Sequence, residues 1–248
     1  MPEIFKHEGK KFWKAEGDFD EHAECFCDFV SRERYVNILK RFDLRGKKII
    51  DLGSGMPKSS PSSPASELPN VIETLGGKII PADISIATLR RQKQLGRSGV
   101  TADVFSLPFK DKTINGGAIS LNLFNASCED LEGDEVLITY QEVEEILREV
   151  FRILQEKTFF ISSTFGYSTF QDRATGRCLN PVPDNLAITV NKIKSMAEGI
   201  GFKNVSEIPL DLQRIGTVVK DIEQERKDLN PKYFEAAFQD PGAVFMEK

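Results

Sequence analysis

One short stretch, residues 48–55, constrains the fold more than any other part of this chain. It reads Lys-Ile-Ile-Asp-Leu-Gly-Ser-Gly, so an apolar run meets an acidic residue and then two glycines spaced one apart. Glycine accepts the positive φ angles of a sharp turn and lets a ligand approach the backbone closely. A strand that enters a glycine-rich turn before a helix is typical of the nucleotide sites of open α/β sheets. The stretch therefore predicts an α/β fold with a binding site at the carboxyl edge of its sheet.

Strand-like and helix-like segments alternate after this turn. Such alternation favours a doubly wound, mostly parallel sheet with helices on both faces, here with seven strands. The predicted strands are residues 48–50, 78–83, 100–103, 115–121, 158–162, 202–210 and 243–246. The predicted helices between them are residues 67–75, 85–95, 135–154 and 187–199.

The first 45 residues predict a helical arm. Ser31 begins a charged first turn, and Tyr35, Ile38, Leu39 and Phe42 follow at helical spacing. The aromatic-rich segment before them is consistent with a lid over a ligand and equally with a packing arm. We therefore expect a helical arm or lid at residues 1–45 and one α/β domain at residues 46–248.

Composition indicates the compartment and the class of partner. The net charge of −5 argues against a nucleic-acid partner, whose binding depends on Lys and Arg contacts to phosphate. A basic run at residues 90–97 is one candidate patch, although a solvated helix face explains it more simply. No apolar run approaches the length of a membrane span, and the N-terminus lacks the apolar core of a secretion signal. The four scattered cysteines suggest no disulfide framework, so we expect a cytoplasmic protein.

Three carboxylates, Asp51, Asp83 and Asp103, follow three successive predicted parallel strands. In an open α/β sheet such positions line the edge where ligands bind. A carboxylate in the first turn repels a pyrophosphate but suits a ligand that carries an ammonium group and ribose hydroxyls. S-adenosylmethionine carries both, so the charge balance favours it over NAD. An NAD site is further disfavoured because the third glycine of the dinucleotide motif is missing after Gly55.

Several motifs, in the same order along the chain, resemble those of the class I, Rossmann-like S-adenosylmethionine-dependent methyltransferases. They span roughly residues 31–210. The matching segments are Ile49–Gly55, Asp83–Ser85, Asp103 with Leu107–Asn115, Glu145–Leu154 with Thr158–Ser162, and Gly201–Val205.

This resemblance implies an enzyme that binds S-adenosylmethionine, releases S-adenosylhomocysteine and methylates a small-molecule acceptor. It also implies the roles of individual residues: one acid for the amino acid end of the cofactor, one for the ribose and one for the adenine, with Asn122 near the transferred methyl group. The implied cofactor-binding residues are Asp51, Gly53, Ser54, Gly55, Asp83, Ile84, Asp103, Val104 and Asn122.

The departures from the family pattern leave alternatives open. Pro57 stands where a third glycine is common, and a Ser/Pro-rich insertion follows at residues 58–66. A methyltransferase-like binding module without catalysis is therefore one alternative, and a protein or RNA methyltransferase is another. No catalytic residue is identified, because His7 and His22 lie in a polar arm and methyl transfer needs mainly in-line placement of the acceptor. The sequence predicts no metal site, since no Cys, His or Asp cluster has ligand spacing.

Overall fold

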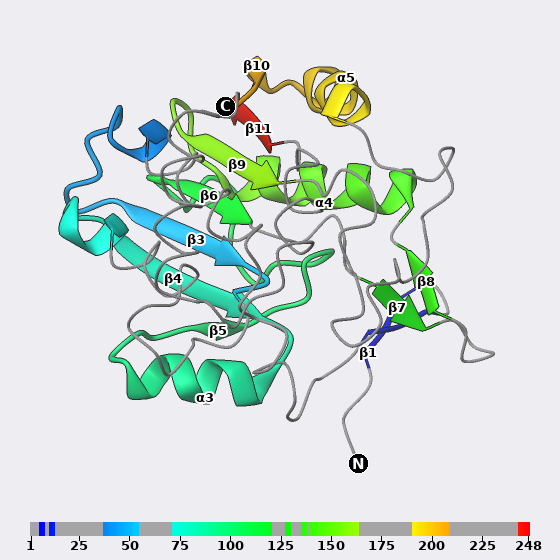
Figure 1. Cartoon of the computed structure of the whole chain (residues 1–248), viewed down its shortest axis with the longest axis horizontal. Coiled ribbons are helices and arrows are strands. Elements are labelled where there is room, and N and C mark those ends of the chain that lie inside the picture. Colours follow the sequence, from blue (N-terminus) through cyan, green and yellow to red (C-terminus); the bar gives the residue numbers. More distant parts are fainter. Residues whose placement is uncertain are drawn as a thin grey trace, which may run out of the picture.

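A seven-stranded sheet forms the centre of the protein in a computed structural model (Figure 1). The structure describes residues 5–7, 10–12, 37–54, 71–120, 127–129, 135–137, 139–163, 190–208 and 243–248. The strand order is β10-β11-β9-β6-β3-β4-β5. These strands are β3 (Lys48–Leu52), β4 (Lys78–Asp83), β5 (Val100–Thr101), β6 (Gly117–Ser120), β9 (Phe159–Ser163), β10 (Lys203–Glu207) and β11 (Ala243–Glu247).

The sheet is mixed, which corrects the expectation of a mostly parallel one. The strands from β9 to β5 are paired in parallel, but β11 lies between β9 and β10 and is antiparallel to both. The sequence could not show this direction, because side chains alternate between the two faces of a strand whichever way the strand runs. The predicted number of strands is confirmed.

Both faces of the sheet are buried, and successive side chains of β3 alternate between the two faces. Ile50 and Leu52 belong to one apolar cluster, which α4 (Tyr140–Ile153) and α5 (Val190–Ile200) complete. Ile49 belongs to the cluster on the other face, with apolar residues of the helical turns at 37–39 and 71–74. A strand buried on both sides reads as a continuous apolar run, which is the pattern of parallel strands covered by helices. Within this run, Asp51 is therefore a polar exception.

The helix α4 begins later than its apolar periodicity suggests. A helix from residue 135 was expected, but residues Glu135–Leu137 form the strand β8 instead. Thr139 caps α4 in a reciprocal arrangement, in which its hydroxyl accepts the Glu142 amide and the Glu142 carboxylate accepts the Thr139 amide. This capping box places the helix start at Tyr140. The helix α3 (Ile86–Gln94) lies within one residue of its predicted bounds. The helix α5, which the structure describes from Val190 onward, ends one residue after the predicted residue 199, and the predicted residues 187–189 lie outside the described part of the chain.

A second, four-stranded sheet joins the N-terminal region to the segment between β6 and α4. Its order is β1 (Phe5–His7), β2 (Lys10–Phe12), β7 (Ser127–Glu129) and β8, with every pair antiparallel. The expected helical arm is thus wrong for residues 5–12 as far as they are described, while residues 37–39 are helical as predicted. Pairing of β2 with β7, far apart in the chain, overrides the local helical pattern. In Figure 1 this sheet lies on the side toward which β3 and β4 point. The lid role stays a prediction.

Among the helices in the described part of the chain, none has the combination of length and apolar character that a membrane span requires.

Candidate functional site at the carboxyl edge of β3, β4 and β5

Strand pairing brings the three predicted acids to one edge of the sheet. In the parallel pairs, Leu52 of β3 is opposite Ala82 of β4, and Asp83 is opposite Thr101 of β5. Asp51 therefore lies just before the end of β3, Asp83 ends β4, and Asp103 follows β5 by two residues. The carboxyl ends of adjacent parallel strands form the ligand-binding edge of such sheets.

The turn after β3 brings bare backbone to this edge. Gly53 has a φ of 62°, in the left-handed region that glycine adopts without strain. The amides of Gly53 and Ser54 both donate to the Ala82 carbonyl, at 2.9 and 3.3 Å, and so fix the turn against β4. The Ser54 hydroxyl oxygen is buried and has no hydrogen-bond partner among the residues that the structure describes. Buried polar atoms without partners are rare in folded proteins.

Asp83 is oriented by the start of the next helix. Its side chain is buried, and one carboxylate oxygen accepts the Ser85 amide at 2.8 Å. Ser85 in turn caps α3, because its hydroxyl accepts the Thr88 amide at 3.3 Å. Ile84, between the acid and the cap, is half-buried. The short helix thus determines where the Asp83 carboxylate lies.

Asp51 is the most perturbed acid of the site. Burial raises its pKa to about 7, the nearby Asp83 carboxylate adds to that rise, and Arg97 opposes it. Arg97 is itself buried, and its guanidinium donates to both carboxylate oxygens of Glu73, at 3.2 and 3.4 Å. Arg97, the cation that opposes the rise in the pKa of Asp51, is therefore shared with a third acid, Glu73. Carboxyls with pKa values near neutrality concentrate at functional sites.

Asp103 lies in a tight turn after β5. Its carboxylate accepts the Phe105 amide at 2.9 Å, and Ser106 forms an antiparallel bridge back to Asp103. Val104 and Phe105 are half-buried and pack against the cluster that α4 and α5 cover. The acid is therefore less buried than Asp51 and Asp83, but its backbone position is fixed by the core.

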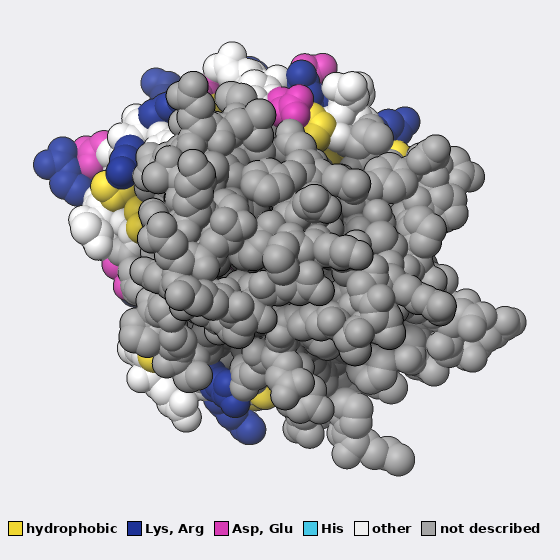
Figure 2. Space-filling model, viewed as in Figure 1, with side chains coloured by type: hydrophobic (Ala, Val, Ile, Leu, Met, Phe, Trp, Pro, Cys, Tyr) yellow, Lys and Arg dark blue, Asp and Glu magenta, His cyan; other side chains and the backbone are white. Residues whose placement is uncertain are grey.

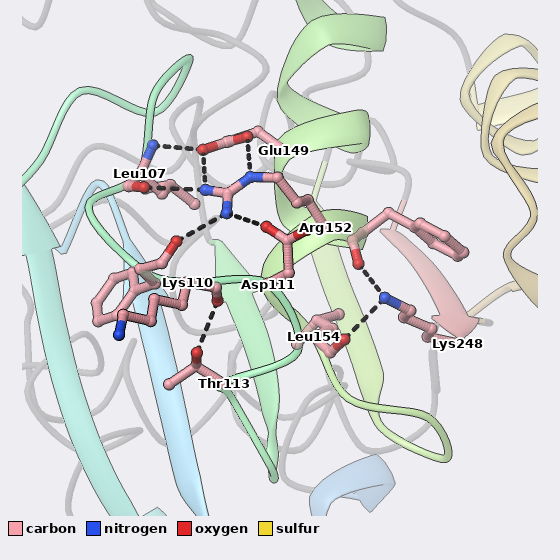
Figure 3. A network of polar contacts seen from close by, with 10 residues as sticks. Leu107, Lys110, Asp111, Thr113, Glu149, Arg152, Leu154 and Lys248 are labelled. Atoms are coloured by element: carbon pink, nitrogen blue, oxygen red, sulfur yellow. Dashed lines mark hydrogen bonds and ion pairs between the residues drawn. The ribbon is translucent and has the colours of Figure 1, made fainter.

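A salt-bridge network supports the loop that follows Asp103 (Figure 3). The Arg152 guanidinium on α4 donates to the Leu107 and Phe109 carbonyls at 3.0 and 2.7 Å. It also pairs with Glu149 and with Asp111, at 2.6 and 2.7 Å. The Glu149 carboxylate accepts the Leu107 amide at 2.6 Å. One helix face thus binds both backbone groups of Leu107. The sequence motif contained this acid–base pair, three residues apart on the helix, but gave no indication that it binds the loop.

The end of α4 in the same view is closed by the last residue of the chain. The Lys248 ammonium donates to the Phe151 and Leu154 carbonyls, the latter at 2.8 Å, and lies 4.2 Å from the centre of the Phe151 ring. A cation beside the final carbonyls of a helix favours the helix dipole. Burial lowers the pKa of this Lys248 ammonium. The contact is structural and lies at the opposite end of α4 from its cap.

The basic run at residues 90–97 does not form a continuous patch. Arg97 is buried against Glu73 and Gln92 is buried in α3, which leaves Arg90 and Lys93 as its exposed cations. On the face seen in Figure 2, basic side chains of the described residues alternate with acidic and neutral ones around the rim. These residues therefore offer no broad basic surface on that face, as nucleic-acid binding would need.

Some predicted features lie outside the described residues. These are Gly55, Asn122, Pro57 with the insertion at 58–66, and His22. In the described part of the chain, no group of His, Cys, Asp and Glu residues is placed to bind a metal ion.

Solved structures share this architecture, although no protein-family model and no curated protein matches the sequence. A methyltransferase from Mesorhizobium loti aligns with a TM-score of 0.54 at 17% identity over 89% of this chain and 98% of its own. One from Methanosarcina mazei has a TM-score of 0.54 at 14% identity, over 86% and 96%. Both are S-adenosylmethionine-dependent. The present chain has the class I methyltransferase fold.

A further similar structure includes ligands. Phosphoethanolamine N-methyltransferase 2 from Haemonchus contortus, in complex with phosphomonomethylethanolamine and S-adenosylhomocysteine, has a TM-score of 0.54 at 11% identity. It covers 96% of this chain, which corresponds to 62% of its own length. At such identities the likeness concerns the fold, and a function for this methyltransferase-fold chain has to be argued from its own residues.

Proposed function

We propose that this protein is an S-adenosylmethionine-dependent methyltransferase. The observation that supports the proposal most is the row of three acids, Asp51, Asp83 and Asp103, across the carboxyl edge of three adjacent parallel strands. A site with this much negative charge disfavours phosphate-bearing nucleotides and suits a cation with hydroxyl and amino donors. Among nucleoside cofactors, S-adenosylmethionine has that combination.

The residues at the edge fit the parts of this cofactor. Asp83 would accept the ribose hydroxyls, with half-buried Ile84 against the adenine, and Asp103 with Val104 would contact the adenine. Asp51 and the turn at Gly53 and Ser54 would face the methionine part. Gly55 and Asn122 belong to the same proposal. When bound, the cofactor supplies an electrophilic methyl group, and the protein aligns the acceptor and excludes water.

We further propose a small-molecule acceptor. The net charge of −5 and the interrupted basic run argue against a nucleic acid. The second sheet, which joins residues 1–45 to the segment between β6 and α4, lies on the side toward which β3 and β4 point. The role that we propose for this sheet is that of a lid over the acceptor, and its position on that side supports the proposal. The Haemonchus contortus enzyme gives a precedent for a small acceptor on this fold.

Substitution of Asp83 tests the cofactor site. Asp83→Ala should weaken S-adenosylmethionine binding by about 1–3 kcal/mol, the scale of hydrogen bonds to a charged acceptor, or about 5- to 150-fold in Kd. Titration calorimetry measures the change. Thr113→Ala is a matched control, because the Thr113 hydroxyl donates to the Lys110 carbonyl in an exposed turn away from the edge. Unchanged affinity in Asp83→Ala would remove the ribose role.

Turnover separates an enzyme from a binding module. Incubation with S-adenosylmethionine labelled in the methyl group, together with small-molecule extracts and separately with protein and RNA, should label the small-molecule fraction. Label in protein or RNA alone would contradict the acceptor class. Cofactor binding without any methyl transfer would favour a methyltransferase-like module that has lost catalysis.

A further inference from the structure

Among the described residues around Asp51, carboxyl groups outnumber buried cations. On the same face of the sheet, Asp83 comes from β4 and Arg97 from the turn after α3, while Glu73 binds that Arg97 from the helical turn at 71–74. Of the other described elements, β6 and the helical turn at 37–39 contribute no charged residue, and the cations of α3 are exposed (Arg90, Lys93) or half-buried (Arg91). Three carboxyls thus share one guanidinium, and all but Glu73 among these four groups are buried.

The hydrogen bonds indicate which of these carboxyls takes up a proton. Asp83 accepts the Ser85 amide, a hydrogen bond that stabilises its carboxylate, and Glu73 accepts two guanidinium donors from Arg97. For Asp51, no donor is found among the described residues. Two buried like charges on adjacent strands repel strongly at low dielectric, and protonation of the less stabilised one relieves the repulsion. The proton therefore belongs on Asp51, in agreement with its raised pKa.

We propose that the Asp51 carboxyl carries a proton in much of the free protein at neutral pH and releases it when S-adenosylmethionine binds. The inference rests on the proposed function, because the sulfonium and ammonium groups of this cofactor supply the positive charge that the cluster lacks. A cation beside Asp51 favours the carboxylate, so binding of the cofactor and loss of the proton are coupled. The proton passes to solvent, and no bond of the ligand changes. When the cofactor leaves, Asp51 takes up a proton again.

Calorimetry on the full-length protein tests this coupling. Titrations of S-adenosylmethionine at pH 7 in buffers with different ionisation enthalpies measure the protons exchanged. Because the pKa of Asp51 is about 7, roughly half a proton should be released per ligand bound. The same linkage makes the affinity about tenfold weaker at pH 6 than at pH 8. Binding without proton exchange, at equal affinity at both pH values, would overturn the coupling and leave the proposed cofactor intact.

Two further measurements assign the proton. Asp51→Asn is similar in shape and cannot titrate, so it should bind S-adenosylmethionine without releasing a proton at pH 7. If this variant releases as many protons as the unmodified protein, the proton comes from another group and the proposal is contradicted. Carbon NMR titration of the free protein, labelled at aspartate carboxyls, should show one signal with a midpoint near pH 7 that is absent from Asp51→Asn. If all aspartates titrate below pH 5, the proposal fails whether or not the cofactor binds. Failure of binding at pH 8 would instead contradict the proposed function.

Discussion

Asp51 occupies the fourth position of a five-residue strand whose last four residues are all buried. An acid there interrupts an apolar run that would otherwise fill the core, and it lies one residue before the strand ends at the carboxyl edge of the sheet. Its raised pKa is a cost to the folded state that a purely structural residue would not need. This tension between stability and function is expected at binding sites.

The raised pKa of Asp51 predicts a specific dependence of stability on pH. An acid whose pKa is higher in the folded protein keeps its proton where the unfolded chain has lost it. Its favourable contribution is therefore complete below pH 3.8, falls as pH rises, and is gone above about pH 7. At about 1.4 kcal/mol per pH unit, the total decrease is up to about 4 kcal/mol. Asp51→Asn should lack this decrease and be the more stable protein at pH 8.

Urea unfolding at pH 5, 7 and 8 checks this expectation. The unmodified protein should lose free energy of unfolding between pH 5 and 8 relative to Asp51→Asn. Parallel curves for the two proteins would show that Asp51 is ionised throughout. Measurements without S-adenosylmethionine are needed, because the ligand itself shifts the stability of the folded state.

The shared position of the three acids could be predicted from the sequence, but the positions of the residues around them could not. That Asp51, Asp83 and Asp103 share an edge was predictable, because each follows a recognisable strand and consecutive parallel strands present their carboxyl ends together. The buried position of Arg97 was not, since its pairing with Glu73 depends on how two helices lie on the sheet. The basic run at residues 90–97, for which a solvated helix face was the simpler interpretation, thus has its last residue, Arg97, in the interior.

At the scale of elements, α4 connects the core to the candidate site. Its apolar face packs under the sheet, and its Glu149 and Arg152 bind the loop that follows Asp103. The apolar pattern of residues 135–154 predicted this helix, but it could not separate Val136 and Leu137 from the helix. Those residues pair with β7, and the signal that marks the boundary is the capping box from Thr139 to Glu142. Local capping chemistry was a better guide to the helix start than periodicity.

The network predicts that two arginines on α4 differ sharply in importance. Arg152→Ala removes the guanidinium donor of the Leu107 and Phe109 carbonyls, and it leaves the mostly buried Glu149 carboxylate without its cation, with only the Leu107 amide donating to it among the described residues. We expect a loss of about 2–4 kcal/mol in the free energy of unfolding. Arg148→Ala removes only an exposed pair with Glu144, one helical turn apart, and should cost about 0.5 kcal/mol.

Chemical denaturation of both variants measures these differences. Arg148→Ala is a matched control because it shortens the same side chain on the same helix. Equal losses would mean that the network contributes no more than an ordinary surface ion pair. A loss confined to Arg152→Ala would show that the loop after Asp103 depends on α4.

At the scale of the whole molecule, the last strand, β11, inserts between two strands that precede it in the chain. β11 lies between β9 and β10 and pairs with both, so its residues contact strands that precede it by some 40 to 80 positions. Val244 and Met246 are fully buried on one face, against the cluster that includes α5. The sequence identified β11 as a strand, but its place in the order is a long-range property that no local pattern encodes. Far-apart pairings of this kind also slow folding.

The pairing of β11 with strands on both of its sides predicts that the sheet unfolds as one unit. Met246→Ala should lower stability by about 2–4 kcal/mol, as a truncated core methionine does. Hydrogen exchange should show the same loss for amides of β3 and of β11, because β11 joins β10 to the rest of the sheet. Gly199→Ala on α5 is the control with the opposite sign: a methyl group there meets nothing within 4 Å, and alanine favours the helix by about 0.5–1 kcal/mol. If Met246→Ala changed only β10 and β11, the C-terminal strands would open separately, and the edge with Asp51 and Asp83 would not depend on them.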